Sequence, residues 1–281
     1  MSDVLVESLC KATEEASNRV QRIYSDEEVI KKGSYTRFGD TELYIHGGGF
    51  SGIWAIGIMQ VFRTLESSGA MKVHILHGYS IGAILAVFYA CNLTTQECIE
   101  AYYMLQEHAD GSGLYSACKN VMERVLPDDA HELCTGRVRI GMTQKFPILW
   151  YREESAFPTR ESLIDAIVNS TSIPYVTAPI TQTVNNYVDG LFGHTIWGWS
   201  SPRLGRSGIE LLPPCVGYTY VFSPTDPYIY GLIINGLTDI IYFLQDKPTK
   251  FIRHLSYLPW HVGKLVRFVD RVHWNLLQRV T

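Results

Sequence analysis

A serine between two glycines, in Gly78-Tyr79-Ser80-Ile81-Gly82, is the side chain of this sequence best placed to act as a nucleophile. It follows a mostly apolar stretch, residues 72–76, that predicts a strand, and it opens an apolar stretch, residues 81–91, that predicts a buried helix. In such a strand–turn–helix the glycines let the turn close without Cβ clashes, and the hydroxyl is lifted to the carboxyl edge of the sheet. The pattern therefore predicts a nucleophile elbow made of Gly78, Tyr79, Ser80, Ile81 and Gly82.

A run of glycines ahead of the serine could hold the negative charge that develops during acyl transfer. It lies between a predicted strand at residues 42–45 and a predicted helix at residues 53–65. Consecutive glycines can turn backbone N–H groups toward one point, with no side chains in the way. A nucleotide-binding loop is the alternative, but the Lys-Ser/Thr end of a P-loop is missing and the strand at 72–76 ends in no acid. We expect an oxyanion hole formed by Gly47, Gly48, Gly49, Phe50, Ser51 and Gly52.

A serine hydroxyl is a weak nucleophile unless a neighbour takes its proton. Asp189, followed by Gly190, ends a predicted strand at residues 186–190, so an ionised carboxylate there could reach the same edge of the sheet. Asp-Gly by itself is also a common turn pair. A Ser-Asp-His triad stays open as a second interpretation, because four histidines lie late enough in the chain: His194, His254, His261 and His273.

The three motifs, in this order, resemble those of the patatin-like phospholipases. The resemblance covers about residues 42–195 and includes a helix at 162–167 and the turn Ser172-Ile173-Pro174 before the aspartate. It implies a catalytic dyad of Ser80 and Asp189, without a histidine and without a metal or organic cofactor. It also implies hydrolysis of carboxylic esters of glycerolipids through an acyl-enzyme. A catalytically weak relative that binds lipid surfaces as a regulator is the alternative from another functional class.

The glycine loop looks closest to the animal neutral-lipid branch of this family, which includes adipose triglyceride lipase and adiponutrin. Three positions depart from the family pattern: Ser51, where many members have Arg or Lys; Ile81, where Ala is common; and Leu191, where Gly or Ala often follows Asp-Gly. The missing cation removes an anchor or anion contact. We expect the bulk of Ile81 and Leu191 to narrow the site.

The elements that must position these residues alternate between strand and helix. Residues 137–143 alternate as a strand would, residues 146–151 could pair with them as a hairpin, and Thr159 is typical of an N-cap before a helix at 162–168. This order predicts an α/β fold, a three-layer sandwich with a central, mainly parallel sheet and a helical C-terminal tail. We expect a helical segment at 1–40, a catalytic domain at 41–223 and a tail at 224–281.

The distribution of charge indicates what the protein could meet. The formal net charge is −4, which argues against a general nucleic-acid binder. Residues 247–281 carry seven Lys or Arg and one acid, so 7 − 1 = +6, and the rest of the chain carries −4 − 6 = −10. With Trp260 and Trp274, this basic tail could lie on a membrane or lipid-droplet surface, or simply pack as a helix. Trp197 and Trp199 could flank an acyl channel or lie in the core.

Cysteine usage and hydropathy bear on the compartment. The six cysteines show no metal-ligand spacing, and no secretory signal is apparent, which is typical of reduced thiols in a cytosol-like compartment. The stretch that comes nearest to a membrane span, residues 228–244, is shorter than the ~20 apolar residues that a span needs. We therefore expect a cytoplasmic protein, peripherally associated with membranes or lipid droplets, and a glycerolipid as its partner. The sequence gives no protein partner.

Overall fold

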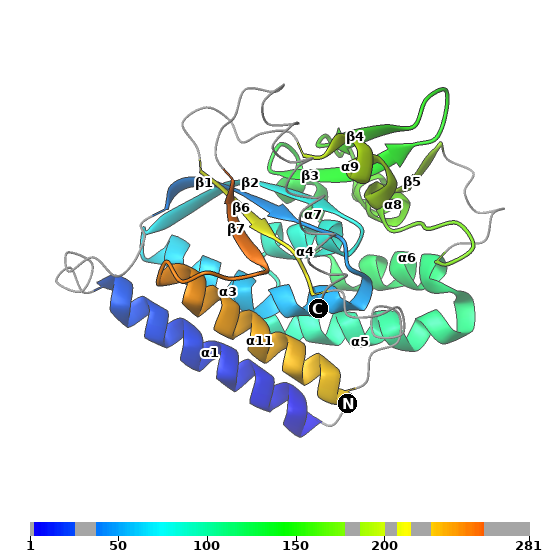
Figure 1. Cartoon of the computed structure of the whole chain (residues 1–281). Coiled ribbons are helices and arrows are strands. Elements are labelled where there is room, and N and C mark those ends of the chain that lie inside the picture. Colours follow the sequence, from blue (N-terminus) through cyan, green and yellow to red (C-terminus); the bar gives the residue numbers. More distant parts are fainter. Residues whose placement is uncertain (1–2, 26–37, 178–185, 200–206, 215–225, 256–281) are drawn as a thin grey trace, which may run out of the picture.

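The computed structural model describes residues 3–25, 38–177, 186–199, 207–214 and 226–255 (Figure 1). Within these ranges a seven-stranded sheet has the order β4-β3-β2-β1-β6-β7, and β5 pairs with β3 outside that path. The three pairs β1–β2, β1–β6 and β2–β3 are parallel. The strands are β1 Gly39–Ile45, β2 Met71–Tyr79, β3 Val138–Gln144, β4 Trp150–Glu154, β5 Tyr187–Asp189, β6 Ser207–Leu211 and β7 Ile252–Leu255. The prediction of a central, mainly parallel sheet in an α/β fold is confirmed.

Helices cover the apolar face of the sheet, onto which Leu43 and Ile45 of β1 point. Figure 1 shows α1, α11 and α3 lying together on that side. All ten residues of α4 are buried, as its uninterrupted apolar sequence predicts. The helices are α1 Asp3–Ser25, α3 Trp54–Ser67, α4 Ile81–Ala90, α5 Thr95–Ser112, α6 Leu114–Val125, α7 Ala130–Cys134, α8 Arg160–Ser170, α9 Gly190–Trp197 and α11 Asp226–Leu244, with a 3₁₀ turn η1 at Gly49–Ile53.

The opposite face of the sheet is aromatic and polar. Side chains alternate along a strand, so Tyr44 of β1 lies on this face, where it joins a buried cluster with Tyr79, Tyr151 and Trp199. Helix α9 packs against β3 and β4. The central sheet is thus flanked by helices.

The long elements lie where the sequence predicts them. The expected N-cap Thr159 is confirmed by a capping box at the start of α8, and Thr94 forms another at the start of α5. The hairpin partner of β3 is confirmed as antiparallel, although its strand begins at Trp150 and not at residue 146.

The expected tail differs in part from the structure. Residues 226–244 form the helix α11, but residues 252–255 form the strand β7, which pairs antiparallel with β6 at the edge of the sheet. A strand forms there because the open edge of β6 offers unpaired backbone groups. The remainder of the basic tail, with Trp260 and Trp274, lies outside the described residues.

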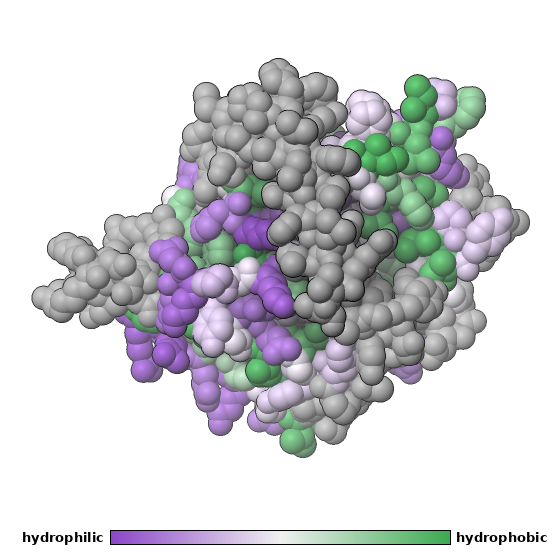
Figure 2. All heavy atoms as spheres, viewed as in Figure 1, coloured by the Kyte–Doolittle hydropathy of each residue, from purple (hydrophilic) through white to green (hydrophobic). Residues whose placement is uncertain are grey.

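The described surface carries a concentration of apolar side chains. Figure 2 shows hydrophobic residues gathering at the upper right, over β4 and α9. None of the described helices is long and apolar enough to cross a membrane.

Candidate active site

The turn that carries Ser80 is strained and packs closely against neighbouring backbone. Ser80 lies between β2 and α4 with φ 55° and ψ −134°, a left-handed conformation that costs a non-glycine residue free energy. A Cβ on Gly82 would lie 2.1 Å from the carbonyl oxygen of Ile45, so the elbow packs directly on the end of β1. Strain at a sharp strand–helix turn is the geometry predicted for a nucleophile elbow.

Ser170, a residue that the sequence does not reveal, anchors this elbow. The backbone N–H of Ser80 donates to the Ser170 hydroxyl oxygen at 2.9 Å, and that hydroxyl donates to the Gly141 carbonyl at 2.7 Å. Ser170 is fully buried at the end of α8. One hydroxyl therefore joins the elbow, β3 and α8. A bond between residues ninety positions apart leaves no local pattern in the sequence.

The sheet register brings Asp189 to the same point from the opposite direction. Met142 of β3 pairs with Arg152 of β4 and with Asp189 of β5, so β5 lies along the other edge of β3. Strand β2 runs along that same edge and ends at Tyr79, which pairs with Gly141. Since β2 is parallel and β5 antiparallel to β3, their carboxyl ends meet head-on. Ser80 and Asp189 lie at that meeting point.

Three hydrogen bonds fix Asp189. Its N–H donates to the Ser172 carbonyl at 2.8 Å, and its own carbonyl accepts from the Thr143 hydroxyl at 2.6 Å. Its Oδ1 accepts from the Leu191 N–H at 2.8 Å, which makes Asp189 the N-cap of α9. The strand therefore ends in a helix and not in the simple Asp-Gly turn that the sequence suggests. Leu191 points outward and is exposed, so it does not narrow the site.

Burial raises the pKa of Asp189 to about 6, while hydrogen bonds from the Leu191 N–H and the Ser80 hydroxyl act to lower it. Its second oxygen, Oδ2, is buried and forms no hydrogen bond of full geometry within the described part of the chain. The contact with Ser80 is thus looser than a complete hydrogen bond, as is common for catalytic pairs before substrate binds. Oδ2 is therefore available to accept a proton.

The glycine loop passes directly beside the serine. A Cβ on Gly47 would lie 2.9 Å from Cβ of Ser80, and Gly49 lines the same cavity as the serine. The Ser51 N–H donates to the Gly48 carbonyl at 3.1 Å, and the Ser51 side chain is fully buried. The backbone N–H of Ser51 is therefore used within the 3₁₀ turn and is not a donor to an oxyanion. The amides of Gly48 and Gly49, with that of Ile81 after the serine, are the candidate donors to an oxyanion.

Two further members of the predicted loop, Phe50 and Gly52, serve its packing. The Phe50 carbonyl accepts from the Tyr102 hydroxyl of α5 at 2.8 Å, and the two rings meet edge to face. A Cβ on Gly52 would lie 2.5 Å from Cγ1 of Ile81, so the loop and the elbow are in contact. These contacts hold the loop against the start of α4.

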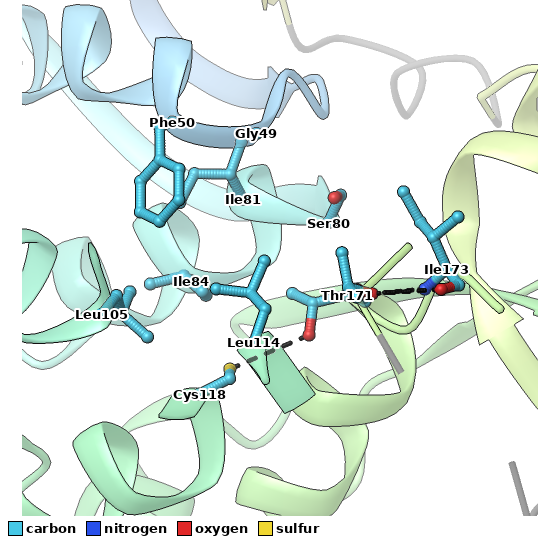
Figure 3. A pocket seen from close by; sticks show the side chains of 11 residues that line it. Gly49, Phe50, Ser80, Ile81, Ile84, Leu105, Leu114, Cys118, Thr171 and Ile173 are labelled. Atoms are coloured by element: carbon cyan, nitrogen blue, oxygen red, sulfur yellow. Dashed lines mark hydrogen bonds between the residues drawn. The ribbon is translucent and has the colours of Figure 1, made fainter. Parts of the chain in front are cut away.

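A narrow apolar cavity of about 60 Å³ opens at Ser80 (Figure 3). Ile81 lies in its wall, as expected for a bulky residue at that position. Figure 3 shows Ser80 between Gly49 on one side and Ile173 on the other, with the hydrophobic side chains extending away from it. The lining residues are Gly49, Phe50, Ser80, Ile81, Ile84, Leu105, Leu114, Cys118, Thr171, Ile173 and Thr177. A site of this shape suits the first carbons of an acyl chain.

The two candidate triad histidines that the structure describes, His194 and His254, are engaged in other contacts. His194 is buried on the aromatic face, where its ring stacks on Tyr79 at 4.7 Å and meets Trp199 at 4.6 Å. His254 packs against Phe38 and Phe243 at the sheet edge. Neither is among the groups that shift the pKa of Asp189. His261 and His273 lie outside the described residues, so the triad has no support in the part of the chain that the structure describes.

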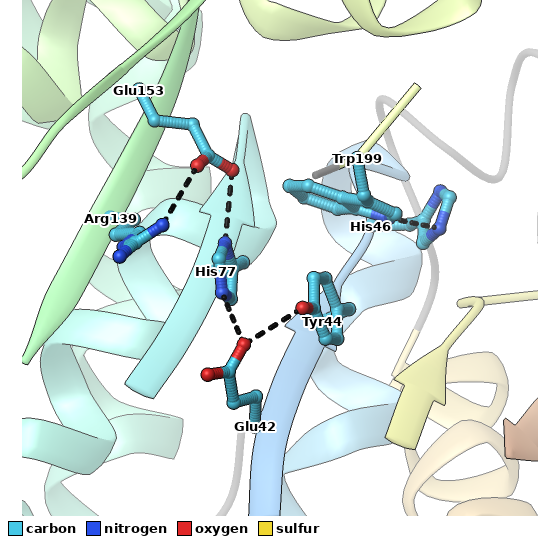
Figure 4. A network of polar contacts seen from close by, with 7 residues as sticks. All are labelled: Glu42, Tyr44, His46, His77, Arg139, Glu153 and Trp199. Atoms are coloured by element: carbon cyan, nitrogen blue, oxygen red, sulfur yellow. Dashed lines mark hydrogen bonds and ion pairs between the residues drawn. The ribbon is translucent and has the colours of Figure 1, made fainter. Parts of the chain in front are cut away.

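The aromatic face contains a buried charge network behind the elbow (Figure 4). His77 Nδ1 lies 3.0 Å from Glu153 and its Nε2 lies 3.4 Å from Glu42, which also accepts from the Tyr44 hydroxyl at 2.9 Å. Burial lowers the pKa of His77, but the two carboxylates outweigh it and the pKa is raised. Arg139 lies 3.7 Å from Glu153. The network ties β1, β2, β3 and β4 together.

His46 connects the glycine loop to the elbow on this face. Its Nδ1 lies 3.0 Å from the Tyr79 hydroxyl and its Nε2 lies 2.6 Å from Glu210. The Trp199 indole N–H lies 2.9 Å from the same Nε2. Trp199 is thus a core residue, and the ring of Trp197 lies tilted against that of Trp150, with centroids 4.2 Å apart. Among the described residues, no three side chains of His, Cys, Asp or Glu are grouped closely enough to hold a metal ion.

Comparison with known proteins agrees with this geometry. Residues 43–196, more than half of the chain, match the family model described as patatin-like phospholipase. The omega-hydroxyceramide transacylase of Homo sapiens is 27% identical over 160 residues, which cover 52% of this chain and 29% of that protein. The chain thus spans less than a third of that relative's length. Membership of the neutral-lipid branch of the family stays a prediction. The chain belongs to the patatin-like phospholipase family.

Proposed function

We propose that this protein is a lipid acyl hydrolase that cleaves carboxylic esters of glycerolipids, with Ser80 as nucleophile and Asp189 as general base. The observation that carries the proposal is the head-on meeting of β2 and β5 along one edge of β3. It puts a hydroxyl and a buried carboxylate of raised pKa at one point, beside a glycine loop and an apolar cavity. Those are the parts that acyl transfer from a lipid ester needs.

The reaction has two halves. Ser80 Oγ attacks the ester carbonyl as its proton passes to Asp189, and the oxyanion is held by the amides of Gly48, Gly49 and Ile81. The alkoxide of the glycerolipid leaves with that proton, and the acyl group stays on Ser80. Asp189 then takes a proton from water, the hydroxide attacks the acyl-enzyme, and the protonated carboxyl returns the proton to Ser80 as the fatty acid departs.

Transfer of the acyl group to an alcohol is a second candidate outcome of the same acyl-enzyme. It is favoured by the similarity to a protein named as a transacylase. The chemistry differs only in the second half, where a hydroxyl of an acceptor lipid takes the place of water. The ratio of free fatty acid to new ester, measured with and without an added alcohol acceptor, separates the two outcomes.

A chromogenic ester tests the assignment of the dyad. We expect Ser80→Ala to lower kcat/KM at least about 10³-fold, and Asp189→Asn at least about 10²-fold, because each removes a group that acts in the transition state. His194→Ala is the control and should keep activity within about threefold. A dead His194→Ala with an active Asp189→Asn would favour the triad. Lipid binding without any turnover in the parent would favour a regulator.

The proposal extends to the class of substrate and to the location of the protein. A site next to an apolar cavity fits a lipid ester without choosing between phospholipid and triacylglycerol. We place the protein in the cytoplasm, at the surface of a membrane or lipid droplet, because its substrate is found there. Product analysis on mixed liposomes and emulsified triacylglycerol, with Ser80→Ala as the blank, would identify the preferred class.

A further inference from the structure

Among the residues that the structure describes, exposed large apolar side chains are concentrated in three segments. Of the twelve such side chains, nine come from these segments, which is more than scattered surface residues would give. They come from the β3–β4 hairpin, from α9 and from the turn after Ile173. We call this set the apolar rim: Phe146, Ile148, Leu149, Trp150, Tyr175, Val176, Leu191, Phe192 and Ile196. Figure 2 shows its hairpin and α9 part as the green area over β4 and α9.

The hairpin tip is held in place while its side chains face solvent. The Phe146 N–H donates to Asn186 Oδ1 at 2.9 Å, and the Phe146 carbonyl accepts from Asn186 Nδ2 at 2.6 Å and from Gln144 Nε2 at 2.8 Å. The Phe146 side chain is nevertheless 73% exposed, and that of Ile148 is 68% exposed. The backbone is thus anchored in a way that presents these side chains outward.

The hairpin and α9 form one surface. The Trp197 indole N–H donates to the Leu149 carbonyl at 3.1 Å, and the rings of Trp150 and Trp197 are 4.2 Å apart. Phe192 and Ile196 are four residues apart on α9 and so lie on the same side of the helix. Two elements distant in sequence therefore present their apolar side chains as a single unit.

The rim is continuous with the candidate site. Leu191 is exposed through its side chain, while its backbone N–H binds the carboxylate of Asp189. On the other side, Tyr175 and Val176 directly precede Thr177, which lines the cavity at Ser80. A surface that the rim contacts would therefore lie next to the opening through which an ester must reach the serine.

We infer that the apolar rim is the surface through which this protein docks on a zwitterionic phospholipid surface, an inference that rests on the proposed function. Phe, Trp and Tyr beside aliphatic residues are the mixture that prefers the boundary between lipid and water. The hairpin carries few charges: Lys145 precedes Phe146, and Arg152 is paired with Glu154 at 3.3 Å. Docking through apolar contact should then need neither anionic lipid nor low salt.

The test compares two sets of substitutions in the full chain. The rim variant is Phe146→Ser, Ile148→Ser and Ile196→Ser together, which changes highly exposed side chains that do not line the cavity at Ser80. The matched control is Val4→Ser, because Val4 is 74% exposed on α1 and outside the rim. For binding, both are made in a Ser80→Ala background, so that phosphatidylcholine vesicles stay intact during co-sedimentation. Equal melting temperatures confirm that all variants are folded.

We expect the rim variant to bind phosphatidylcholine vesicles at least tenfold more weakly than its parent, and Val4→Ser to bind within twofold. With Ser80 restored, kcat/KM on a soluble short-chain ester should stay within twofold, while hydrolysis of vesicle lipid falls at least tenfold. Docking at the rim is overturned if the rim variant binds vesicles like its parent. It is also overturned if binding requires anionic vesicles and disappears at high salt, or if the rim variant merely converts a dimer to a monomer.

The failure of the docking surface and that of the proposed function can be told apart. If the parent cleaves no ester at all, the proposed function fails, and vesicle binding in the Ser80→Ala background still reports on the rim. If the soluble ester is cleaved but the rim variant binds vesicles normally, the docking inference fails and the catalytic assignment stands.

Discussion

At the scale of single residues, Asp189 combines full burial with one carboxylate oxygen, Oδ2, that has no complete hydrogen bond among the described residues. Burial raises its pKa to about 6, while the Leu191 N–H engages only Oδ1. A general base is most effective when its pKa lies near the working pH, because it is then ionised and still basic enough to hold a proton. The environment of Asp189 thus meets a requirement that an exposed aspartate, with a pKa of about 4, would miss.

The pH dependence of the rate follows from this shift. Only the ionised carboxylate can accept the Ser80 proton, so kcat/KM on a soluble ester should rise about tenfold per pH unit below about pH 6 and level off above about pH 7. A histidine base would give a similar midpoint, but its ionisation enthalpy is large and that of a carboxyl is small. Profiles at two temperatures should therefore share one midpoint. A midpoint that falls clearly on warming would contradict a carboxylate base.

Ser170 should matter for the elbow without touching substrate. In Ser170→Ala, the Ser80 N–H and the Gly141 carbonyl both lose a buried partner, which should lower the free energy of unfolding by about 1–3 kcal/mol. Since the strained turn loses its anchor, we also expect kcat to fall more than KM rises. Ser170→Thr, which keeps a hydroxyl, should restore part of kcat. Unchanged kcat in a folded Ser170→Ala would show that the turn holds without this bond.

These residue-level contacts mark the limit of sequence reasoning. Ser80 and Asp189 were predictable because Ser80 lies between Gly78 and Gly82 and Asp189 precedes Gly190, each at a strand end, and such a pattern is local. Ser170 and Thr143 were not, because each acts through one hydrogen bond to a distant segment and looks like any other hydroxyl in its own element. The outward direction of the Leu191 side chain follows from the helix that starts at Gly190. The motif Asp189-Gly190-Leu191 does not by itself reveal that helix.

At the scale of elements, the acyl cavity is built where α4, α5 and α6 meet the elbow. Its volume of about 60 Å³ admits only the first carbons of a chain, so a longer acyl group must displace the side chains at the far end. Leu114 and Cys118 of α6 supply that end together with Leu105 of α5. Helix α6 should therefore set the preference for chain length.

Two opposite substitutions on α6 test this assignment. Leu114→Ala removes side-chain volume and should raise the ratio of kcat/KM for a long-chain ester to that for a short-chain ester several-fold. Cys118→Leu adds volume in the same cavity and should lower the ratio. The ratio of two substrates in one preparation cancels any loss of folded protein. Equal ratios in both variants would place the acyl chain elsewhere.

Helices and strands with a long sequence pattern were predictable, whereas short strands that depend on pairing with a neighbouring strand were not. The ten apolar residues of α4 and the alternation of β3 identify themselves. Strand β5 was predicted at residues 186–190, but strands β6 and β7 have only five and four residues, too few for a period to stand out. They become strands because β6 pairs with the edge of β1 and β7 with the edge of β6, and those edges exist only once the sheet has formed.

At the scale of the whole molecule, titratable groups inside and outside the site affect how stability depends on pH. Asp189, His77 and Asp239 have raised pKa values, so the folded state holds their protons more tightly than the unfolded state does. His254 has a lowered pKa and acts in the opposite sense. The raised groups make the fold less stable as pH rises, in the range where Asp189 becomes able to act as a base. Activity and stability therefore compete near neutral pH.

The contribution of Asp189 to this competition can be isolated. Its pKa is about 3.9 in an unfolded chain and about 6 in the fold, so its ionisation costs nothing below about pH 4 and up to about 3 kcal/mol above about pH 7. Asp189→Asn keeps an acceptor for the Leu191 N–H but carries no charge. Its melting temperature should equal that of the parent near pH 4 and exceed it by several degrees at pH 8. A gap that does not grow with pH, in thermal scans of both proteins in the same buffers, would mean that Asp189 ionises in the fold as easily as in water.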